Sequence, residues 1–226
     1  MVNIKGLTFT YPNGKGVKNA SFEVNKGEVV GFLGPNGAGK TTTIRCILGF
    51  MKGNSGTCKI DGKECFENAE ENMKDIGFIA GEIAFPENMR AKEYFEFISK
   101  IRGCDMRRCD ELCKMFEVDT KQIIQKLSKG NKQKVALVSA FMHDPKVLIL
   151  DEPSSGLDLL MQHKFLGLVN KAKAEGKSVL MSTHNFNEVE RTCDRVVIIK
   201  DGEIRADKKL TDIKNLEKTF LEVYDV

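Results

Sequence analysis

The chain has 226 residues, of which 41% are hydrophobic, and its formal net charge is +3. That length and composition suit one large or two small globular domains, and the mild, scattered positive charge gives no support for a nucleic-acid partner. Because no apolar run approaches the roughly 18 residues needed to span a membrane, and no long apolar segment opens the chain, we expect a cytoplasmic protein.

The N-terminal part of the chain predicts antiparallel strands. Residues 3–10 and 17–24 show the apolar alternation of strands, and the segment from Tyr11 to Gly14 is a strong turn signal between them. A second turn leads into residues 28–33, which are mostly apolar and of strand length. We therefore expect opening strands that are antiparallel and joined by short turns, directly before the next motif.

The next segment fits the pattern G-x-x-x-x-G-K-[ST] of a phosphate-binding loop, and it lies between a predicted strand and a helix expected from residue 39 to about 49. Its residues are Gly34, Pro35, Asn36, Gly37, Ala38, Gly39, Lys40 and Thr41, and Thr42 follows as a further nucleotide-binding candidate. The glycines let backbone N–H groups point inward at phosphates, and the helix N-terminus adds partial positive charge there. Lys40 would reach the β- and γ-phosphates of a bound nucleoside triphosphate, and the Thr41 hydroxyl would bind Mg²⁺.

Beyond the loop helix, two short strands precede a helical region. Residues 57–60 and 76–79 have strand character, whereas apolar residues recur at helical spacing from about 90 to 126. We interpret the latter as a helical insertion between two parts of an α/β core. A new helix begins at residues 127–131.

The seven cysteines indicate no disulfide framework. Cys104, Cys109 and Cys113 form the one cluster, but no C-x-x-C pair or nearby histidine completes a zinc site. Reduced thiols are therefore the expectation.

Two carboxylates stand at the end of a buried strand. Residues 147–150 are continuously apolar, which is typical of a strand buried on both faces of a parallel sheet. Asp151 and Glu152 follow at its carboxyl end, the edge where open α/β sheets bind ligands. Asp151 would hold Mg²⁺ directly or through water, and Glu152 would polarise an attacking water as general base.

A histidine follows the next buried strand, predicted at residues 178–181. If this strand runs parallel beside the Asp151 strand, His184 lies near the γ-phosphate as a donor that steadies the transferring group. His143 and His163 have no such placement, and we expect both on helix surfaces.

The remaining elements complete one α/β domain. Helices are expected at 158–175, 186–193 and 211–226, with a hairpin at 196–205. We expect residues 1–89 and 127–226 to form the core, with the helical subdomain at about 90–126.

Together these motifs resemble the ATP-binding subunit of ABC transporters over essentially the whole chain. Residues 34–41 match the family's Walker A motif and 147–152 its Walker B motif with the catalytic Glu152. Residues 127–131 resemble the LSGGQ signature, and 155–158 match the D-loop that ends at Asp158. By the same resemblance, His184 is the switch histidine, and Tyr11 is the aromatic residue that stacks on adenine.

The resemblance implies a P-loop NTPase core with a mostly parallel sheet, an N-terminal antiparallel β subdomain and the inserted helical subdomain. Two subunits, here a homodimer, would pair head to tail, with each ATP between the Walker A motif of one and the signature of the other. Ser128 and the Gly130 N–H would then face the partner's γ-phosphate. Hydrolysis would open the dimer and drive a transmembrane permease, which places the protein on the inner face of the cell membrane.

Two positions depart from the family's pattern. Lys129 and Asn131 replace the first glycine and the final glutamine of the signature, and Lys129 resembles exporters with separate permease chains. After the strand at 76–79 the family has a glutamine that touches Mg²⁺ and water, and in register that position is Gly81. The adjacent Glu82 either substitutes as an acidic metal sensor or is a solvated loop residue.

Three functions compete. The first is a transport ATPase, with export favoured by Lys129 and by the lack of a further regulatory domain. The second is an ABC ATPase that acts on nucleic acid or ribosomes, but such proteins carry a long coiled coil or two ATPase domains, and here Lys40 and Ser128 are 128 − 40 = 88 positions apart. The third is a nucleotide-binding module without hydrolysis, against which Glu152 and His184 argue.

Overall fold

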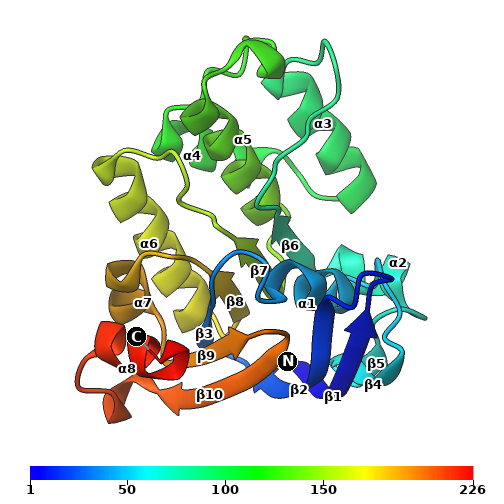
Figure 1. The fold of residues 1–226 in the computed structure, drawn as a ribbon. Coiled ribbons are helices and arrows are strands. Elements are labelled where there is room, and N and C mark those ends of the chain that lie inside the picture. Colours follow the sequence, from blue (N-terminus) through cyan, green and yellow to red (C-terminus); the bar gives the residue numbers. More distant parts are fainter. Residues whose placement is uncertain (226) are drawn as a thin grey trace.

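Two sheets organise the protein. The computed structural model describes residues 1–225. The first sheet has four strands in the order β2-β1-β4-β5, and every pairing in it is antiparallel. It lies beside helix α1 (Lys40–Ile47) in Figure 1. Its strands are β1 (Val2–Thr10), β2 (Gly16–Val24), β4 (Ser55–Ile60) and β5 (Lys63–Glu64).

The second sheet has six strands in the order β10-β9-β3-β8-β7-β6. They are β3 (Val29–Leu33), β6 (Ile76–Ile79), β7 (Val147–Asp151), β8 (Ser178–Ser182), β9 (Arg195–Lys200) and β10 (Glu203–Lys209). All pairings are parallel except the β9–β10 hairpin. Every residue of β3, β7 and β8 is buried, because helices and the first sheet cover both faces, and this explains their continuous apolar runs. The predicted α/β fold class is confirmed.

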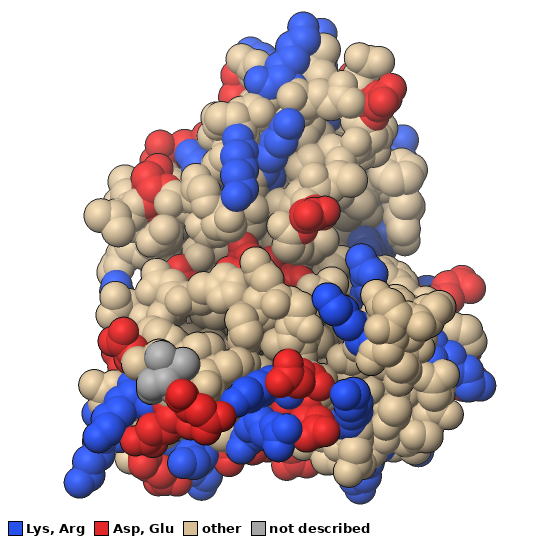
Figure 2. All heavy atoms as spheres, in the orientation of Figure 1, with Lys and Arg blue, Asp and Glu red and all other residues tan. Residues whose placement is uncertain are grey.

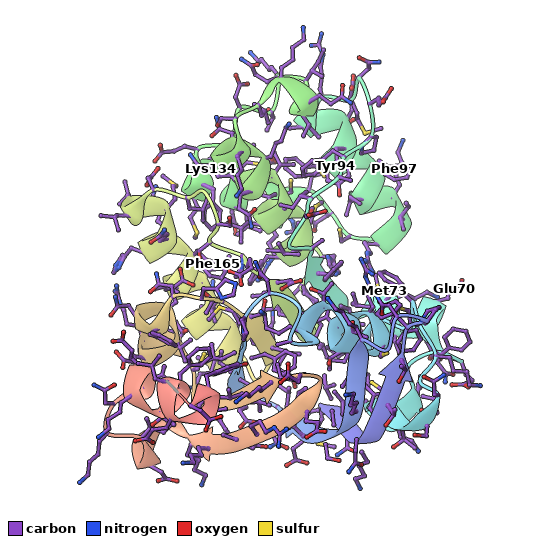
Figure 3. The ribbon with its side chains drawn as sticks, viewed as in Figure 1. Glu70, Met73, Tyr94, Phe97, Lys134 and Phe165 are labelled. Carbon is purple, nitrogen blue, oxygen red and sulfur yellow. The ribbon has the colours of Figure 1, made fainter. Side chains whose placement is uncertain are left out.

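Helices cover the second sheet and build the upper lobe in Figure 1. They are α1 (Lys40–Ile47), α2 (Ala69–Lys74), α3 (Ala91–Arg102), α4 (Arg107–Phe116), α5 (Lys129–Phe141), α6 (Leu159–Ala174), α7 (Phe186–Thr192) and α8 (Leu216–Tyr224). Helix α5 packs on α3 and α4 at one side and on β6 at the other. On α3, Tyr94 lies toward α5, whereas Phe97 lies on the far side and is exposed (Figure 3).

The buried side chains form two cores. One contains Phe95 of α3 and Phe116 of α4 together with Leu148 and Val179 of the sheet, so the helical lobe is packed continuously onto the α/β part. The other lies between the two sheets around α1 and includes Phe32. The division at residues 90 and 126 stays a prediction.

Several local predictions need correction. The sequence pattern missed α2 and the two-residue β5, since α2 buries only Asn72. The expected helix at 211–226 is confined to α8, which begins after Asn215 caps it, and Val226 lies outside the described residues.

His143 was expected on a helix surface, which is wrong. It follows α5, is half-buried, and its Nε2 lies 3.0 Å from the carbonyl oxygen of Ile76. The cause is the close packing of α5 on β6. At Gly77 the two elements approach so closely that a side chain would clash with the Ala140 carbonyl oxygen. His163 is exposed on α6, as expected.

Other expectations can be compared with the described part of the chain. All seven cysteines are free, and no cluster of metal-binding side chains occurs within residues 1–225. None of the helices in that range is both long and apolar enough to cross a membrane. On the face in Figure 2, Lys and Arg gather on the helical lobe, while acidic and basic side chains are mixed along the lower edge.

Candidate active site

The phosphate loop joins β3 to α1 by a tight backbone path that glycine makes possible. A Cβ atom on Gly34 would lie 2.6 Å from the Ile199 carbonyl oxygen, and one on Gly39 would lie 2.9 Å from that of Gly16. Gly37 and Gly39 also have left-handed φ values of 84° and 113°. The loop therefore packs against β9 and the start of β2, while Pro35, Asn36 and Gly37 are exposed.

Lys40 begins α1 and is buried, with 7% of its surface exposed. Its Nζ donates to the carbonyl oxygens of Gly34 and Pro35. Burial lowers the pKa of Lys40, and the nearby carboxylates of Glu152 and Asp151 oppose this shift. The ammonium group therefore lies inside the loop, where it is positioned for a phosphate anion.

Thr41 and Asp151 meet at the end of β7. The Thr41 hydroxyl donates to Asp151 Oδ2 over 3.3 Å, and the Ser182 hydroxyl donates to Oδ1. Asp151 and Ser182 are opposite each other in the parallel pairing of β7 and β8, so the strand register creates this contact. A carboxylate and a hydroxyl are the hard oxygen ligands that Mg²⁺ prefers, and the donor set fits that metal.

Glu152 leaves β7 with a left-handed backbone, at φ 48°. Its Oε1 lies 3.0 Å from Nε2 of His184, since β7 and β8 are parallel neighbours and end side by side. Burial raises the pKa of the Glu152 carboxyl and the charge of Asp151 adds to this, while the electrostatic influence of His184 and Lys40 opposes it. A raised pKa makes this carboxylate a stronger base toward a water proton.

Tyr11 lies beside the loop, in a cavity of about 320 Å³. The Tyr11 ring makes an edge contact with Phe9 at 4.9 Å between ring centres, and its hydroxyl lies 3.5 Å from the Met51 sulfur. The cavity is also lined by Lys15, Gly16, Pro35, Asn36, Gly37, Gly39, Lys40, Thr41 and Thr42. An aromatic face next to the phosphate loop suits a nucleobase.

A second cavity, of about 670 Å³, joins the phosphate loop to the segment after β6. Lys40, Thr41 and Asp151 line it together with Gly81 and Glu82. A Cβ atom on Gly81 would lie 3.2 Å from Asp151 Oδ2, so this backbone passes directly beside the metal-ligand candidate. Glu82 is exposed at the rim.

The remaining predicted residues lie elsewhere. Ser128 caps α5 by accepting from the Asn131 N–H, and Asp158 caps α6 by accepting from the Met161 N–H. Gly130 touches the D-loop, where a Cβ atom would lie 2.4 Å from the Gly156 carbonyl oxygen. None of Ser128, Gly130 and Asp158 lines either cavity that contains Lys40.

Two supporting residues escaped the sequence analysis. Ser182 holds Asp151, and the buried Gln133 of α5 donates from Nε2 to the Pro153 carbonyl oxygen over 2.7 Å. The signal for Ser182 was available, because a parallel register places strand ends opposite each other. Gln133 could be recognised only as a polar residue on an apolar helix face.

Comparison with known proteins settles the family. The family described as ABC transporter matches residues 17–155. The ABC transporter ATP-binding protein YxlF of Bacillus subtilis is 37% identical over 225 residues, which are 97% of this chain and 74% of the relative. The chain belongs to the ABC transporter family. The bacitracin transport ATP-binding protein BcrA of Bacillus licheniformis is 34% identical, with the match covering 98% of this chain and 74% of that protein.

Solved structures of other ABC ATPases have the same fold. An ATP-binding subunit of an ABC transporter superposes with a TM-score of 0.93 at 30% identity, covering 99% of both chains. The bacterial cassette MJ0796, bound to ADP and Pi after hydrolysis, superposes with a TM-score of 0.83 at 29% identity over 93% of this chain and 99% of that one. The predicted family, the ATP-binding function and the ATP hydrolase class are thus confirmed for this ABC ATPase.

Proposed function

We propose that two copies of this ABC ATPase close head to tail around two ATP molecules. The observation that carries this is the separation of the site into two parts. Lys40, Thr41 and Asp151 line one cavity, whereas Ser128 and Gly130 lie outside it. A second copy would supply the missing half, because the cap of α5 presents N–H groups and a partial positive charge to a phosphate. The dimeric structure of MJ0796, at 27% identity and a TM-score of 0.81, supports the arrangement.

Within each half, the side chains divide the work of hydrolysis. Thr41 and Asp151 would hold Mg²⁺, which neutralises phosphate charge when bound. Glu152 takes a proton from the attacking water, and its contact with His184 keeps both groups at the γ-phosphate end of the site. His184 donates a hydrogen bond to the transferring phosphoryl group, and Lys40 binds the β- and γ-phosphates. Tyr11 stacks on the adenine.

We further propose that Glu82 is the acidic sensor of this site. The side chain that other members of the family place at position 81 is missing here, and Gly81 passes within contact distance of Asp151. Glu82 lines the same cavity and supplies an oxygen ligand at its rim.

Export through a separate membrane permease is the transport role we propose, with the ATPase on the inner face of the membrane. Two relatives are named for such roles: BcrA for bacitracin transport and SkfE of Bacillus subtilis for SkfA peptide export, the latter 33% identical over 92% of this chain and 88% of its own length. Lys129 in the signature segment also favours export through a separate permease.

The dimer can be tested with Glu152→Gln, which keeps ATP binding and slows hydrolysis. We expect this variant to shift from monomer to dimer in saturating ATP and Mg²⁺ when measured by size exclusion with light scattering. The double variant Lys40→Ala/Glu152→Gln is the control and should remain monomeric. A Glu152→Gln protein that stays monomeric would refute the sandwich, and ATP-driven flux in permease-containing vesicles would test export.

A further inference from the structure

Helix α7 follows His184 directly and contains a buried carboxylate. Glu188, in its first turn, is 2% exposed, although ionised side chains are rarely buried without strong compensation. Both of its carboxylate oxygens accept hydrogen bonds from the two residues that flank His184. The Thr183 hydroxyl donates to Oε2 over 2.8 Å, and the Asn185 amide Nδ2 donates to Oε1 over 3.4 Å.

These contacts fix the whole turn around His184. The Asn185 N–H donates to the Thr183 hydroxyl oxygen over 3.1 Å, and Asn185 Oδ1 accepts from the Asn187 N–H at the cap of α7. An ionised carboxylate only accepts, so Thr183 and Asn185 must both turn their donors toward Glu188. That orientation leaves Asn185 Oδ1 free to accept from the Asn187 N–H, so the Glu188 carboxylate sets the orientation of the Asn185 amide.

Two further contacts hold helix α7 in place beside this turn. The Thr192 hydroxyl donates to the Glu188 carbonyl oxygen over 2.6 Å. Phe186 packs against Phe220 of α8 with 5.4 Å between ring centres. His184 itself, in contrast, is half exposed, and its Nε2 lies 3.0 Å from Oε1 of Glu152. The ring therefore depends on its flanking residues for its position.

We propose that Glu188 is a positioning residue for His184 in ATP hydrolysis, which rests on the proposed role of His184 at the γ-phosphate. Glu188 holds Thr183 and Asn185, and they hold the backbone from which the imidazole reaches Glu152. Loss of the carboxylate leaves the histidine present and lets its ring move away from the reacting phosphate. A small displacement of a catalytic group lowers the rate of the chemical step strongly, whereas it changes the affinity for the substrate little.

The decisive variant is Glu188→Gln in the full-length protein. The glutamine has the same size, but it is neutral and one of its two acceptor oxygens is replaced by an NH₂ donor. If this NH₂ faces Asn185 Nδ2, that hydrogen bond is lost. If it faces Thr183, the hydroxyl must reverse its role and accept, so both charge-assisted hydrogen bonds are lost in either orientation. We expect kcat for ATP to fall about 10-fold to 100-fold, with KM within about twofold of the parent. Glu190→Gln removes the same charge from an exposed position of α7 and should leave both constants unchanged.

A double-mutant cycle separates positioning from a general structural effect. If Glu188 acts through the histidine, Glu188→Gln should lower kcat less than about twofold in a His184→Ala background. A full 10-fold loss in that background, or an equal loss in Glu190→Gln, overturns the positioning role. Wild-type kcat in His184→Ala alone refutes instead the proposed role of His184. If Glu188→Gln does not fold, Thr183→Val removes the hydrogen bond to Glu188 Oε2, and the same double-mutant cycle with that variant decides the proposal.

Discussion

At Gly130, one added methyl group should distinguish ATP binding in the same chain from ATP-dependent dimerisation. It lies in the first turn of α5, two residues after the signature Ser128, and it touches the D-loop at Gly156. A Cβ atom added by Gly130→Ala would lie 2.4 Å from the Gly156 carbonyl oxygen. That separation must open by about 1 Å to reach ordinary van der Waals contact.

The free-energy cost of this steric overlap depends on how far the neighbouring backbone can shift. Overpacking of this kind destabilises by about 1–3 kcal/mol when the surroundings yield only in part. Gly156 also has a left-handed φ of 79°, so its backbone conformation is specific to glycine. We therefore expect α5 and the D-loop to shift apart, which displaces the surface offered to a partner's ATP. The cavity around Lys40 does not contain Gly130, so binding of ATP in the same chain should persist.

The assay measures both properties in a Glu152→Gln background. We expect Gly130→Ala to bind a fluorescent ATP analogue within about twofold of its parent and to need at least about 10-fold more protein for ATP-dependent dimerisation, as one lost contact of about 1.4 kcal/mol would give. Gly167→Ala is the matched control, since its Cβ would meet nothing within 4 Å inside α6. It should dimerise normally and unfold at a slightly higher temperature. Normal dimerisation of Gly130→Ala would refute the reasoning.

Three further predictions concern the catalytic half. Lys40→Ala should weaken ATP binding at least about 10-fold in calorimetry, because it removes the cation inside the loop; unchanged affinity would exclude that role. Since burial raises the pKa of Glu152 and the base must be deprotonated, kcat should fall with acidification at a pH above the ordinary glutamate value of 4.5, and a profile flat down to that pH would contradict this. Glu82→Ala should raise the Mg²⁺ concentration needed for half-maximal turnover, and an unchanged requirement would assign Glu82 to the solvated rim.

Much of the fold was predictable because its signals are local. The phosphate loop needs a fixed order of glycines and Lys40, and the buried strands are continuous apolar runs. The neighbourhood of Glu152 and His184 also followed from the sequence, because parallel strands end at the same edge of a sheet. The structure adds the atomic contact between the two side chains at 3.0 Å.

The other features of the structure depend on contacts between segments that are distant in the sequence. No local sequence pattern predicts those contacts. His143 has the sequence context of a helix end, yet α5 packs so closely on β6 that its ring is drawn to the Ile76 carbonyl. Glu188 has the appearance of a solvated helix residue, like Glu190 two positions later. Only the turn of the chain before α7 brings Thr183 and Asn185 onto its carboxylate.

The same reasoning explains how the two halves of the site are joined within one chain. Helix α5 carries Ser128 at its N-terminus, touches the D-loop through Gly130, and holds the segment after β7 through Gln133, whose Nε2 donates to the carbonyl oxygens of Pro153 and Glu152. A shift of α5 by about 1 Å away from this segment would lengthen the 2.7 Å hydrogen bond to Pro153 beyond hydrogen-bond distance. In the proposed dimer, a partner's ATP bound at Ser128 would therefore act on the same rigid element that fixes the backbone of Glu152.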